Sequence, residues 1–430
     1  MNEGYFCANY ITKVRKLLYD AFTRLYPLFV KAFSPFNEKA RLWQEGRKNI
    51  FERMEKAITP GTNIIWVHCS SLGEFEQGRP VIEKLRSVYT THKILLTFFS
   101  PSGYEVRKDY KGVDHIFYLP QDNQQNAKKF FDIVNPALAI FVKYEFWHYY
   151  LNEAKNRKVS LLLISAIFWK EQAFFSKQGK FHRQMLSCFT HFFVQNQESV
   201  NLLNSIDLDN KVTLAGDTRF DRVVEIAEQF EPIPLIEQFI SSSDTIVAGS
   251  TWPKDDSKLS SYANTRTNVR FIIAPHNIDK DRIDECLKLY KHSVLFSDLS
   301  KIRLPANANT IIIDNVGMLS KLYKYGTINF VGGGFAGDGI HNVLEAAVYG
   351  RPVVFGPLYQ RYIEAIELVA STGGISINDA IELASQFDCL LKKDEIYLQK
   401  CQASIDYVYS KRGSTKKILQ FIQEKRLLTN

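Results

Sequence analysis

Cysteine is scarce in this chain, and long apolar runs are missing. Six cysteines are scattered over 430 residues with no C-x-x-C pair and no metal-like spacing, so we expect neither a disulfide framework nor a metal site. A run of about 18 uncharged apolar residues is absent, as is an apolar segment followed by a small-residue cleavage site. We therefore expect neither a membrane-spanning helix nor a secretory signal. P-loop, G-x-S-x-G and H-E-x-x-H motifs are also absent, which disfavours the enzyme classes that they define.

Positive charge is concentrated near the N-terminus. Residues 1–60 hold eleven Lys and Arg against six Asp and Glu, which supplies +5 of the net charge of +8. Apolar residues recur at steps of three and four from Ile11 to Phe33, which predicts an amphipathic helix, interrupted at Pro27. Such a helix with basic flanks is typical of a membrane interface. An ordinary surface helix docked on its own domain is the alternative.

Short apolar runs then alternate with helical patterns in two series. The first series occupies 63–68, 93–97, 115–118, 137–142, 160–165, 191–194 and 212–215, and the second occupies 245–248, 269–274, 293–295, 310–313, 328–331 and 352–355. Buried strands separated by helices predict parallel sheets covered on both faces.

This pattern predicts an α/β chain of the GT-B architecture, with two Rossmann-like parallel-sheet domains facing a cleft and an N-terminal amphipathic helix. We assign residues 1–40 to a basic, membrane-associating segment, 41–230 to an N-terminal domain and 231–430 to a C-terminal domain. The proline- and serine-containing segment 225–243 is the expected linker, and the last helix can cross back onto the first half.

The most distinctive motif is the glycine-rich segment 329–347, NFVGGGFAGDGIHNVLEAA. A strand leads into Gly332, Gly333 and Gly334, and a helix is expected from about His341. Glycines let the backbone approach a ligand closely, and N–H groups at a helix start can bind phosphate. Glu345, one turn into that helix, can accept hydrogen bonds from ribose hydroxyls. The alternative is that the glycines serve only a tight turn.

Polar residues follow several other expected strands. They occur in IIAPHN at 272–277, in IIIDNVGML at 311–319, in WVHCSSLGEFE at 66–76 and in KYEFW at 143–147. Ligands of open parallel sheets collect at the carboxyl ends of strands. Glu74 is placed there to take a proton from a hydroxyl, and Glu145 to hold a hydroxyl or a cation. The alternative for Glu74 is a helix N-cap cluster.

These motifs occur together, in this order, in the 3-deoxy-D-manno-octulosonic acid (Kdo) transferases, which the chain resembles over nearly its whole length. The matching blocks are WVHCSSLGEFEQGRPVI from residue 66, YEFW at 144–147, GDTRFDRV at 216–223, GSTW at 249–252, IIAPHN at 272–277, DNVGMLSKLY at 314–323 and FVGGGFAGDGIHNVLEAA at 330–347. The resemblance implies a GT-B glycosyltransferase that transfers Kdo from CMP-Kdo to a lipid A precursor in lipopolysaccharide biosynthesis. It also implies an acceptor domain at 41–230, a CMP-sugar donor domain at 231–430 and no cofactor.

The same resemblance places the chain at the cytoplasmic face of the inner membrane, peripheral or N-terminally anchored. The expected partners are CMP-Kdo, the lipid A precursor and an anionic membrane surface, and not nucleic acid.

The resemblance further implies roles for single residues. Glu74 is the general base. Beside it, the position of Ser71 and Glu145 after two expected strands makes them candidates to support the acceptor or the transition state. The donor contacts are Pro275, His276, Val316, Gly317, Met318, Asn342, Val343, Leu344 and Glu345, and the glycine motif adds Gly333 and Gly334. Many members of the family carry Arg where this chain has His276, so donor affinity or its pH dependence is expected to differ.

We interpret the reaction as an inverting displacement at the anomeric carbon of Kdo, with the 332–342 loop stabilising the departing phosphate. One alternative is another GT-B enzyme, a UDP-sugar transferase or epimerase. The other is a catalytically inactive, membrane-bound scaffold of the same fold. Comparing the affinities for CMP and UDP distinguishes the Kdo transferase from a UDP-sugar enzyme. Detectable turnover eliminates the inactive scaffold.

Overall fold

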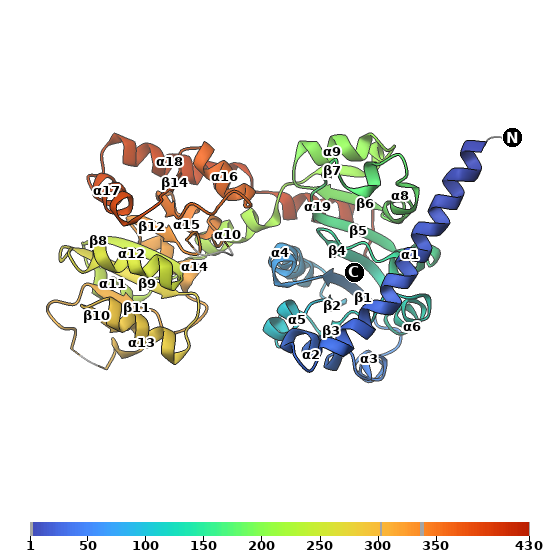
Figure 1. The fold of residues 1–430 in the computed structure, drawn as a ribbon, viewed down its shortest axis with the longest axis horizontal. Helices are drawn as coiled ribbons and strands as arrows, with labels where there is room; N and C mark the ends of the chain where they lie inside the picture. The colour runs from blue at the N-terminus through green and yellow to red at the C-terminus, as the bar shows by residue number, and fades with distance from the viewer. Residues whose placement is uncertain (1–2, 302, 336–338, 430) are drawn as a thin grey trace. The chain divides into compact units, whose positions relative to one another are not determined.

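The computed structural model describes residues 3–301, 303–335 and 339–429, with side chains from Thr12 onward (Figure 1). The chain divides into two compact units. Unit 1 contains residues 1–221 and 413–430, and unit 2 contains residues 222–412. The chain therefore returns to unit 1 for its last helix, α19 (Ser414–Glu424).

Unit 1 is built on a seven-stranded parallel sheet with the order β3-β2-β1-β4-β5-β6-β7. Its strands are β1 (Ile64–Cys69), β2 (Lys93–Phe98), β3 (His115–Tyr118), β4 (Pro136–Val142), β5 (Ser160–Ala166), β6 (His191–Val194) and β7 (Val212–Leu214). All seven runs predicted in the first half are strands. Side chains that alternate along β1 enter two different cores: Trp66 packs in one, and Ile65 packs in the other with Ile418 and Ile422 of α19.

The helices of unit 1 that precede and cover this sheet are α1 (Glu3–Phe33), α2 (Glu38–Glu45), α3 (Ile50–Ala57), α4 (Leu72–Val88), α5 (Pro101–Arg107), α6 (Gln124–Val134), α7 (His148–Asn156), α8 (Lys180–Leu186) and α9 (Gln197–Asn204). Short 3-10 helices lie at Ala173–Phe175 and Asp209–Lys211.

The N-terminal helix α1 is continuous, so the predicted interruption at Pro27 is wrong. Proline lacks the N–H that would bond the carbonyl four residues earlier, here that of Thr23. The side-chain amide of Gln121 donates to the Thr23 carbonyl instead, so this carbonyl keeps a partner and the helix continues. No helix in the described part of the chain combines the length and apolarity needed to cross a bilayer.

The helix α1 contacts the rest of unit 1 through polar and aromatic side chains. The Tyr19 hydroxyl donates to Asp122 and accepts from the His148 backbone N–H at 3.1 Å. Tyr149 donates to Asp20 at 2.6 Å. The apolar residues lie on the other side and are exposed: Leu17, Leu18, Phe22, Leu25, Leu28, Phe29 and Phe33 each show about half or more of their surface. The helix is thus docked on its own domain, as in the alternative prediction, but its stripe of Leu and Phe stays largely exposed.

Unit 2 has its own seven-stranded parallel sheet, with the order β10-β11-β9-β8-β12-β13-β14. The strands are β8 (Asp244–Thr251), β9 (Val269–Pro275), β10 (Ser293–Leu295), β11 (Thr310–Ile312), β12 (Ile328–Val331), β13 (Val353–Phe355) and β14 (Gly374–Ser376). The first six coincide with the predicted runs. β14 was not predicted, because a strand of three residues with one fully buried carries almost no pattern.

The helices of unit 2 are α11 (Pro234–Ile240), α12 (Pro253–Ala263), α13 (Lys280–Leu289), α14 (Leu319–Leu322), α15 (Leu344–Ala347), α16 (Ile363–Ala370), α17 (Ala380–Leu390) and α18 (Glu395–Ser410), with 3-10 turns at Phe296–Asp298 and Tyr323–Tyr325. The predicted linker at 225–243 is mostly helical. α10 (Thr218–Glu228) enters it, and Pro234 occupies the first turn of α11, where proline's missing N–H costs nothing.

Candidate active site

Each sheet has a point at which the strand order reverses. In unit 1 the chain moves from β1 to β2 on one side and later to β4 on the other. In unit 2 the corresponding centre is β8, with β9 on one side and β12 on the other. Open parallel sheets bind ligands just beyond the carboxyl ends of the strands at such a point. The segments that follow β1 and β4, and those that follow β8 and β12, are therefore the candidate sites.

Glu74 follows β1 and belongs to the first turn of α4. The backbone N–H of the N-cap residue Ser71 donates to Glu74 Oε2 at 2.8 Å, and the Ser71 hydroxyl donates to the same oxygen. This is a capping box, so the helix-start role considered as the alternative exists. The capping box occupies only one carboxylate oxygen, because both hydrogen bonds reach Oε2. The half-buried side chain keeps Oε1 for another partner.

Glu145 follows β4 and is buried, with 8% of its surface exposed. Its Oε2 accepts from Trp147 Nε1 at 2.6 Å and lies 3.1 Å from His68 Nε2. The other nitrogen of His68 is 2.9 Å from the Thr97 hydroxyl, which already accepts from Trp66 Nε1. Trp147 Nε1 also lies 3.2 Å from His68 Nε2, so Trp147, His68 and Glu145 form one network. This network fixes the orientation of the carboxylate.

The charges of Glu74 and Glu145 both influence Cys69, the last residue of β1. Burial raises the pKa of the Cys69 thiol, and the charges of Glu74 and Glu145 add to that effect. The structure thus brings these two predicted site residues together around one strand end.

Four further polar residues at this edge of unit 1 were not assigned a role from the sequence. Arg219 bonds Asp217 through Nε at 2.9 Å and Nη2 at 2.7 Å, and Gln77 donates to the same carboxylate. Burial alone would raise the pKa of Asp217, but Arg219 holds it below its ordinary value. The pKa of Tyr144 is raised by burial and then by Glu74 and Asp217. The block GDTRFDRV was the available signal for the Asp217–Arg219 pair.

In unit 2 three rings stack beyond β8 and β9. The His276 ring lies 4.7 Å from that of Trp252 and 4.5 Å from that of His341, nearly parallel to both. Trp252 Nε1 also donates to His341 Nε2 at 3.0 Å. Although His276 is exposed overall, partial burial lowers its pKa, so the imidazole is neutral at pH 7. Trp252 and His341 were part of quoted motifs, but neither was predicted as a site residue.

The glycine loop after β12 is tightly packed against backbone. A Cβ on Gly332 would lie 2.4 Å from the Ser250 carbonyl, and one on Gly334 would lie 2.6 Å from Gly356 N. Gly333 has φ +93° and donates its N–H to Asp255 Oδ2 at 2.9 Å. These glycines are therefore required for the tight backbone packing of the turn, which was the alternative to a role in ligand binding.

The hydrogen bonds of this loop also restrict its chemistry. The Gly332 N–H donates to Gly249, so two of the N–H groups predicted for a phosphate already have protein partners.

The predicted helix after the glycine loop begins later than expected. α15 starts at Leu344, not near His341, and has four residues. The Asn342 side chain accepts from the Leu344 N–H at 3.1 Å, which holds the preceding residues in a turn. Asn342 also donates to Glu345 Oε1, the second residue of α15. Val343 and Leu344 are fully buried.

The remaining predicted donor residues lie on two strand ends. Pro275 is the last residue of β9 and is buried. Val316 is 80% exposed in the loop after β11, followed by Gly317 at φ +95° and the half-buried Met318. Stacking joins His276 to His341, which the chain places next to Asn342. No group of three or more His, Cys, Asp or Glu suited to a metal ion occurs among the described residues.

Comparison with known proteins agrees with this arrangement. Residues 45–222 match the family model described as 3-deoxy-D-manno-octulosonic-acid transferase (Kdo transferase). A Kdo transferase from Aquifex aeolicus is 27% identical over 352 residues, covering 80% of this chain and 91% of that protein. A bifunctional glycosyltransferase/methyltransferase from Fusobacterium nucleatum is 25% identical over 375 residues, covering 85% of this chain but only 55% of that protein.

Among solved structures, the UDP-GlcNAc 2-epimerase from Neisseria meningitidis bound to UDP-GlcNAc superposes with a TM-score of 0.57. The sequences are 16% identical, and the match covers 84% of this chain and 100% of that one, so this likeness concerns the fold.

The two parallel sheets and the matched domain define a glycosyltransferase of the GT-B class. Within that class, the model matched over residues 45–222 and relatives 25–27% identical along most of the chain show that it is similar to the Kdo transferases.

Proposed function

We propose that the protein transfers Kdo from CMP-Kdo to a lipid A precursor with inversion at the anomeric carbon. The observation that carries this proposal is the pair of carboxylates at the switch point of unit 1. Glu74 is oriented through one oxygen and keeps the other for a ligand, and Glu145 is held by Trp147 and His68. The similarity to Kdo transferases supports the choice of donor and acceptor class.

Glu74 acts as the general base in this proposal. It removes the proton of the acceptor hydroxyl while that oxygen forms its bond to the anomeric carbon. The bond between that carbon and the phosphate oxygen breaks at the same time, and CMP leaves with the electron pair. Glu145 and Ser71 support the acceptor or the transition state. General-base catalysis typically contributes about 10²–10⁴-fold to the rate.

The donor residues of unit 2 are Pro275, His276, Val316, Gly317, Met318, Gly333, Gly334, Asn342, Val343, Leu344 and Glu345. Because the N–H of Gly333 is bound by Asp255, phosphate stabilisation falls to other groups of the glycine loop and its neighbours. Glu345 serves as the acceptor for the ribose hydroxyls, in competition with Asn342.

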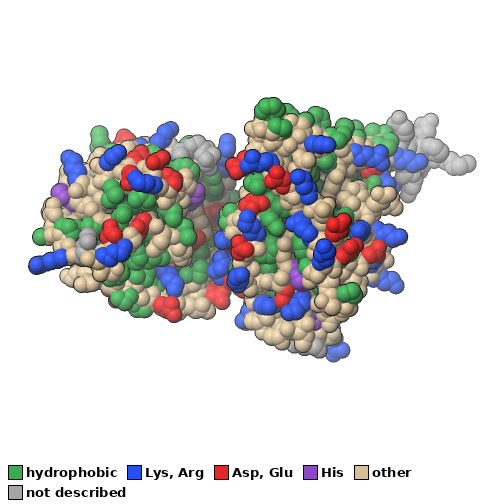
Figure 2. Space-filling view, turned by 90° about the horizontal axis from the view of Figure 1, so that it is seen from below, with side chains coloured by type: hydrophobic (Ala, Val, Ile, Leu, Met, Phe, Trp, Pro, Cys, Tyr) green, Lys and Arg blue, Asp and Glu red, His purple; other side chains and the backbone are tan. Residues whose placement is uncertain are grey.

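We further propose that the protein acts at the cytoplasmic face of the inner membrane and binds its anionic surface through α1. A helix that turns Tyr19 and Asp20 toward its own domain and exposes Leu and Phe is the reverse of an ordinary surface helix. Lys13, Lys16, Arg24 and Lys31 are exposed on the same helix. On the face of unit 1 seen in Figure 2, by contrast, acidic and basic side chains are interspersed.

The test is an assay of CMP release with CMP-Kdo and a lipid A precursor. Glu74→Gln should abolish most of the release and leave CMP affinity unchanged. Tighter binding of UDP than of CMP would favour a UDP-sugar enzyme, and absence of turnover with folded protein would favour the inactive scaffold.

A further inference from the structure

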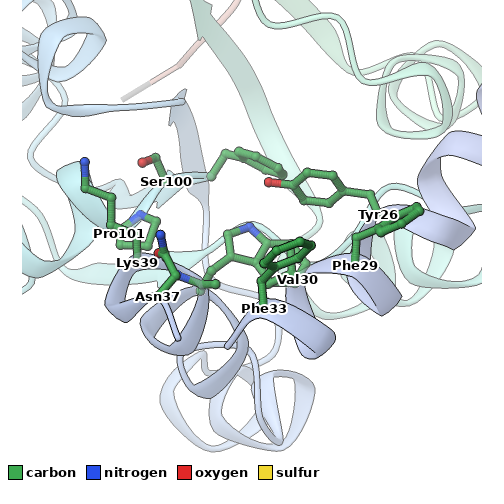
Figure 3. A pocket seen from close by; sticks show the side chains of 11 residues that line it. Tyr26, Phe29, Val30, Phe33, Asn37, Lys39, Ser100 and Pro101 are labelled. Carbon is green, nitrogen blue, oxygen red and sulfur yellow. The ribbon is translucent and has the colours of Figure 1, made fainter. Parts of the chain in front are cut away.

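A cavity of about 380 Å³ opens in unit 1 between α1, α2 and the turn from β2 into α5. Its apolar wall consists of Tyr26, Phe29, Val30, Phe33, Trp43 and Phe99. Figure 3 shows the rings of Phe29 and Phe33 on one side and Ser100 and Lys39 on the other. The volume lies within the range of about 300–1,000 Å³ that is usual for small-molecule pockets.

The outer part of this cavity continues into the exposed apolar face of α1. Phe29 and Phe33 line it, yet 60% and 61% of their surfaces are exposed. Phe36, just beyond α1, is 87% exposed. Large apolar side chains at the mouth of an apolar cavity favour a ligand that is itself partly embedded in a membrane.

The inner part of the cavity touches the residues that position the carboxylates. The Phe99 ring lies 4.7 Å from that of Trp147, whose indole N–H donates to Glu145. The Ser100 N–H donates to the Ser70 carbonyl at 2.7 Å, one residue before the cap of α4. A ligand in the cavity therefore contacts Phe99 and Ser100, which in turn contact Trp147 and the residues just before α4, the helix that carries Glu74.

We propose that this cavity binds one acyl chain of the acceptor, while the acceptor sugar lies at Glu74 and Glu145. This inference rests on the proposed function and deepens it, because it assigns a chain-binding site to the acceptor. The aromatic wall suits a hydrocarbon chain, and Lys39 and Asn37 at the rim suit the polar, anionic end of such a lipid. Because each methylene removed from water favours binding, burial of a few carbons suffices to change the acceptor KM.

The test fills the cavity from α2. Ala40 lines the cavity and is half-buried, whereas Ala32 on α1 is exposed and does not line it. Ala40→Phe should raise the KM for a tetraacylated lipid A precursor at least tenfold and leave the KM for its fully deacylated disaccharide unchanged. Ala32→Phe, which adds the same bulk outside the cavity, should change neither. Val30→Phe fills the cavity from α1 and gives a second variant if Ala40→Phe unfolds.

A second arm works without turnover. Dibromodecanoate should quench Trp43 fluorescence saturably, and the tetraacylated precursor should compete with it. Ala40→Phe should remove this quenching, and Trp43→Phe identifies the reporter. If Trp43 fluorescence of the parent is quenched and the precursor competes, but neither acceptor is turned over, the proposed function fails while the cavity still binds the precursor's chain. Unchanged KM and quenching in Ala40→Phe would overturn the inference, as would weaker vesicle binding without a change in KM, which would assign the cavity to bulk lipid.

Discussion

Glu74 combines a structural and a chemical role that one substitution can separate. It is the capping-box residue of α4, and glutamine is equally suited to that position. Glu74→Gln should therefore leave the thermal midpoint unchanged while turnover falls by about 10²–10⁴-fold, because the amide cannot accept the proton. Near-normal turnover in Glu74→Gln would leave Glu74 only its helix-start role.

His276 should make donor binding depend on pH. Partial burial lowers its pKa, so it is neutral at pH 7 and becomes cationic only below its ordinary range near 6.5. His276→Arg places a permanent cation there, which should tighten CMP binding by about 1.5–3 kcal/mol at pH 7.5. The advantage over the parent should shrink as the pH falls and His276 gains its proton.

Calorimetric titration of both proteins with CMP at several pH values measures that difference, and the ligand's own titration cancels. Cytidine, which lacks the phosphate, is the control ligand and should not distinguish them. An advantage of Arg that stays constant with pH would show that His276 does not face the phosphate.

The residue scale is also where sequence reading was weakest. Glu74 and Glu145 could be predicted as site residues because each follows a strongly apolar strand. The Asp217–Arg219 pair follows β7, which has only three residues, and its ion pair becomes visible only with coordinates. The stack of Trp252, His276 and His341 joins residues from three separate segments, which no local pattern reveals.

At the scale of elements, Asp255 ties α12 to the glycine loop. Its Oδ2 accepts from the N–H groups of Trp252 and Gly333 at 2.8 and 2.9 Å, and burial nevertheless raises its pKa from 3.8 to about 6. Between these values the folded protein holds a proton that the unfolded chain has lost. The free energy of unfolding should therefore fall as the pH rises through this window, by about 3 kcal/mol at most.

Asp255→Asn removes this titration and keeps one acceptor oxygen for the loop. Chemical denaturation at pH 4–7 should show the parent losing stability relative to the variant as the pH rises. Asp122 in unit 1 also has a pKa raised to about 6, but it titrates in both proteins and cancels in the difference. Parallel stability curves would contradict the assignment.

The helix α1 should attach the protein to anionic vesicles through its exposed apolar face. Leu18, Phe22 and Leu25 lie on that face and away from the polar contacts with unit 1. Each such side chain contributes about 1.5–3 kcal/mol when fully buried, so the triple substitution to Ser should release the protein from vesicles without lowering its thermal midpoint. Co-sedimentation measures this release.

Salt separates the two contributions of α1. The exposed basic residues contribute about 1 kcal/mol each near an anionic surface, so raised salt should weaken the binding of the parent. If the triple variant still co-sediments as the parent does, the attachment lies elsewhere in the chain.

Elements were predicted well where periodicity is strong. The long strands coincide with the predicted runs, whereas β14 and α15 have three and four residues and give no repeat to detect. Pro27 misled the prediction because the amide of Gln121 that compensates it is remote in sequence. The face by which α1 docks was also unpredictable, since it depends on Asp122 and His148.

At the scale of the whole molecule, two α/β units share one chain that leaves unit 1 near Asp221 and returns at Gly413. The return is secured at its start, because Asp221 accepts from the backbone N–H groups of Gly413 and Thr415. The two-sheet architecture followed from the sequence, because thirteen apolar runs in two series leave few other folds. The predicted cleft between the two domains stays a prediction.

The central claim is that this chain transfers Kdo from CMP-Kdo to a lipid A precursor. Its most direct test is mass spectrometry of the acceptor after incubation of the purified protein with both substrates. We expect the mass of the precursor to rise by that of one or more Kdo residues, with equimolar release of CMP and almost none in Glu74→Gln. An unmodified acceptor in the presence of folded, CMP-binding protein would contradict it.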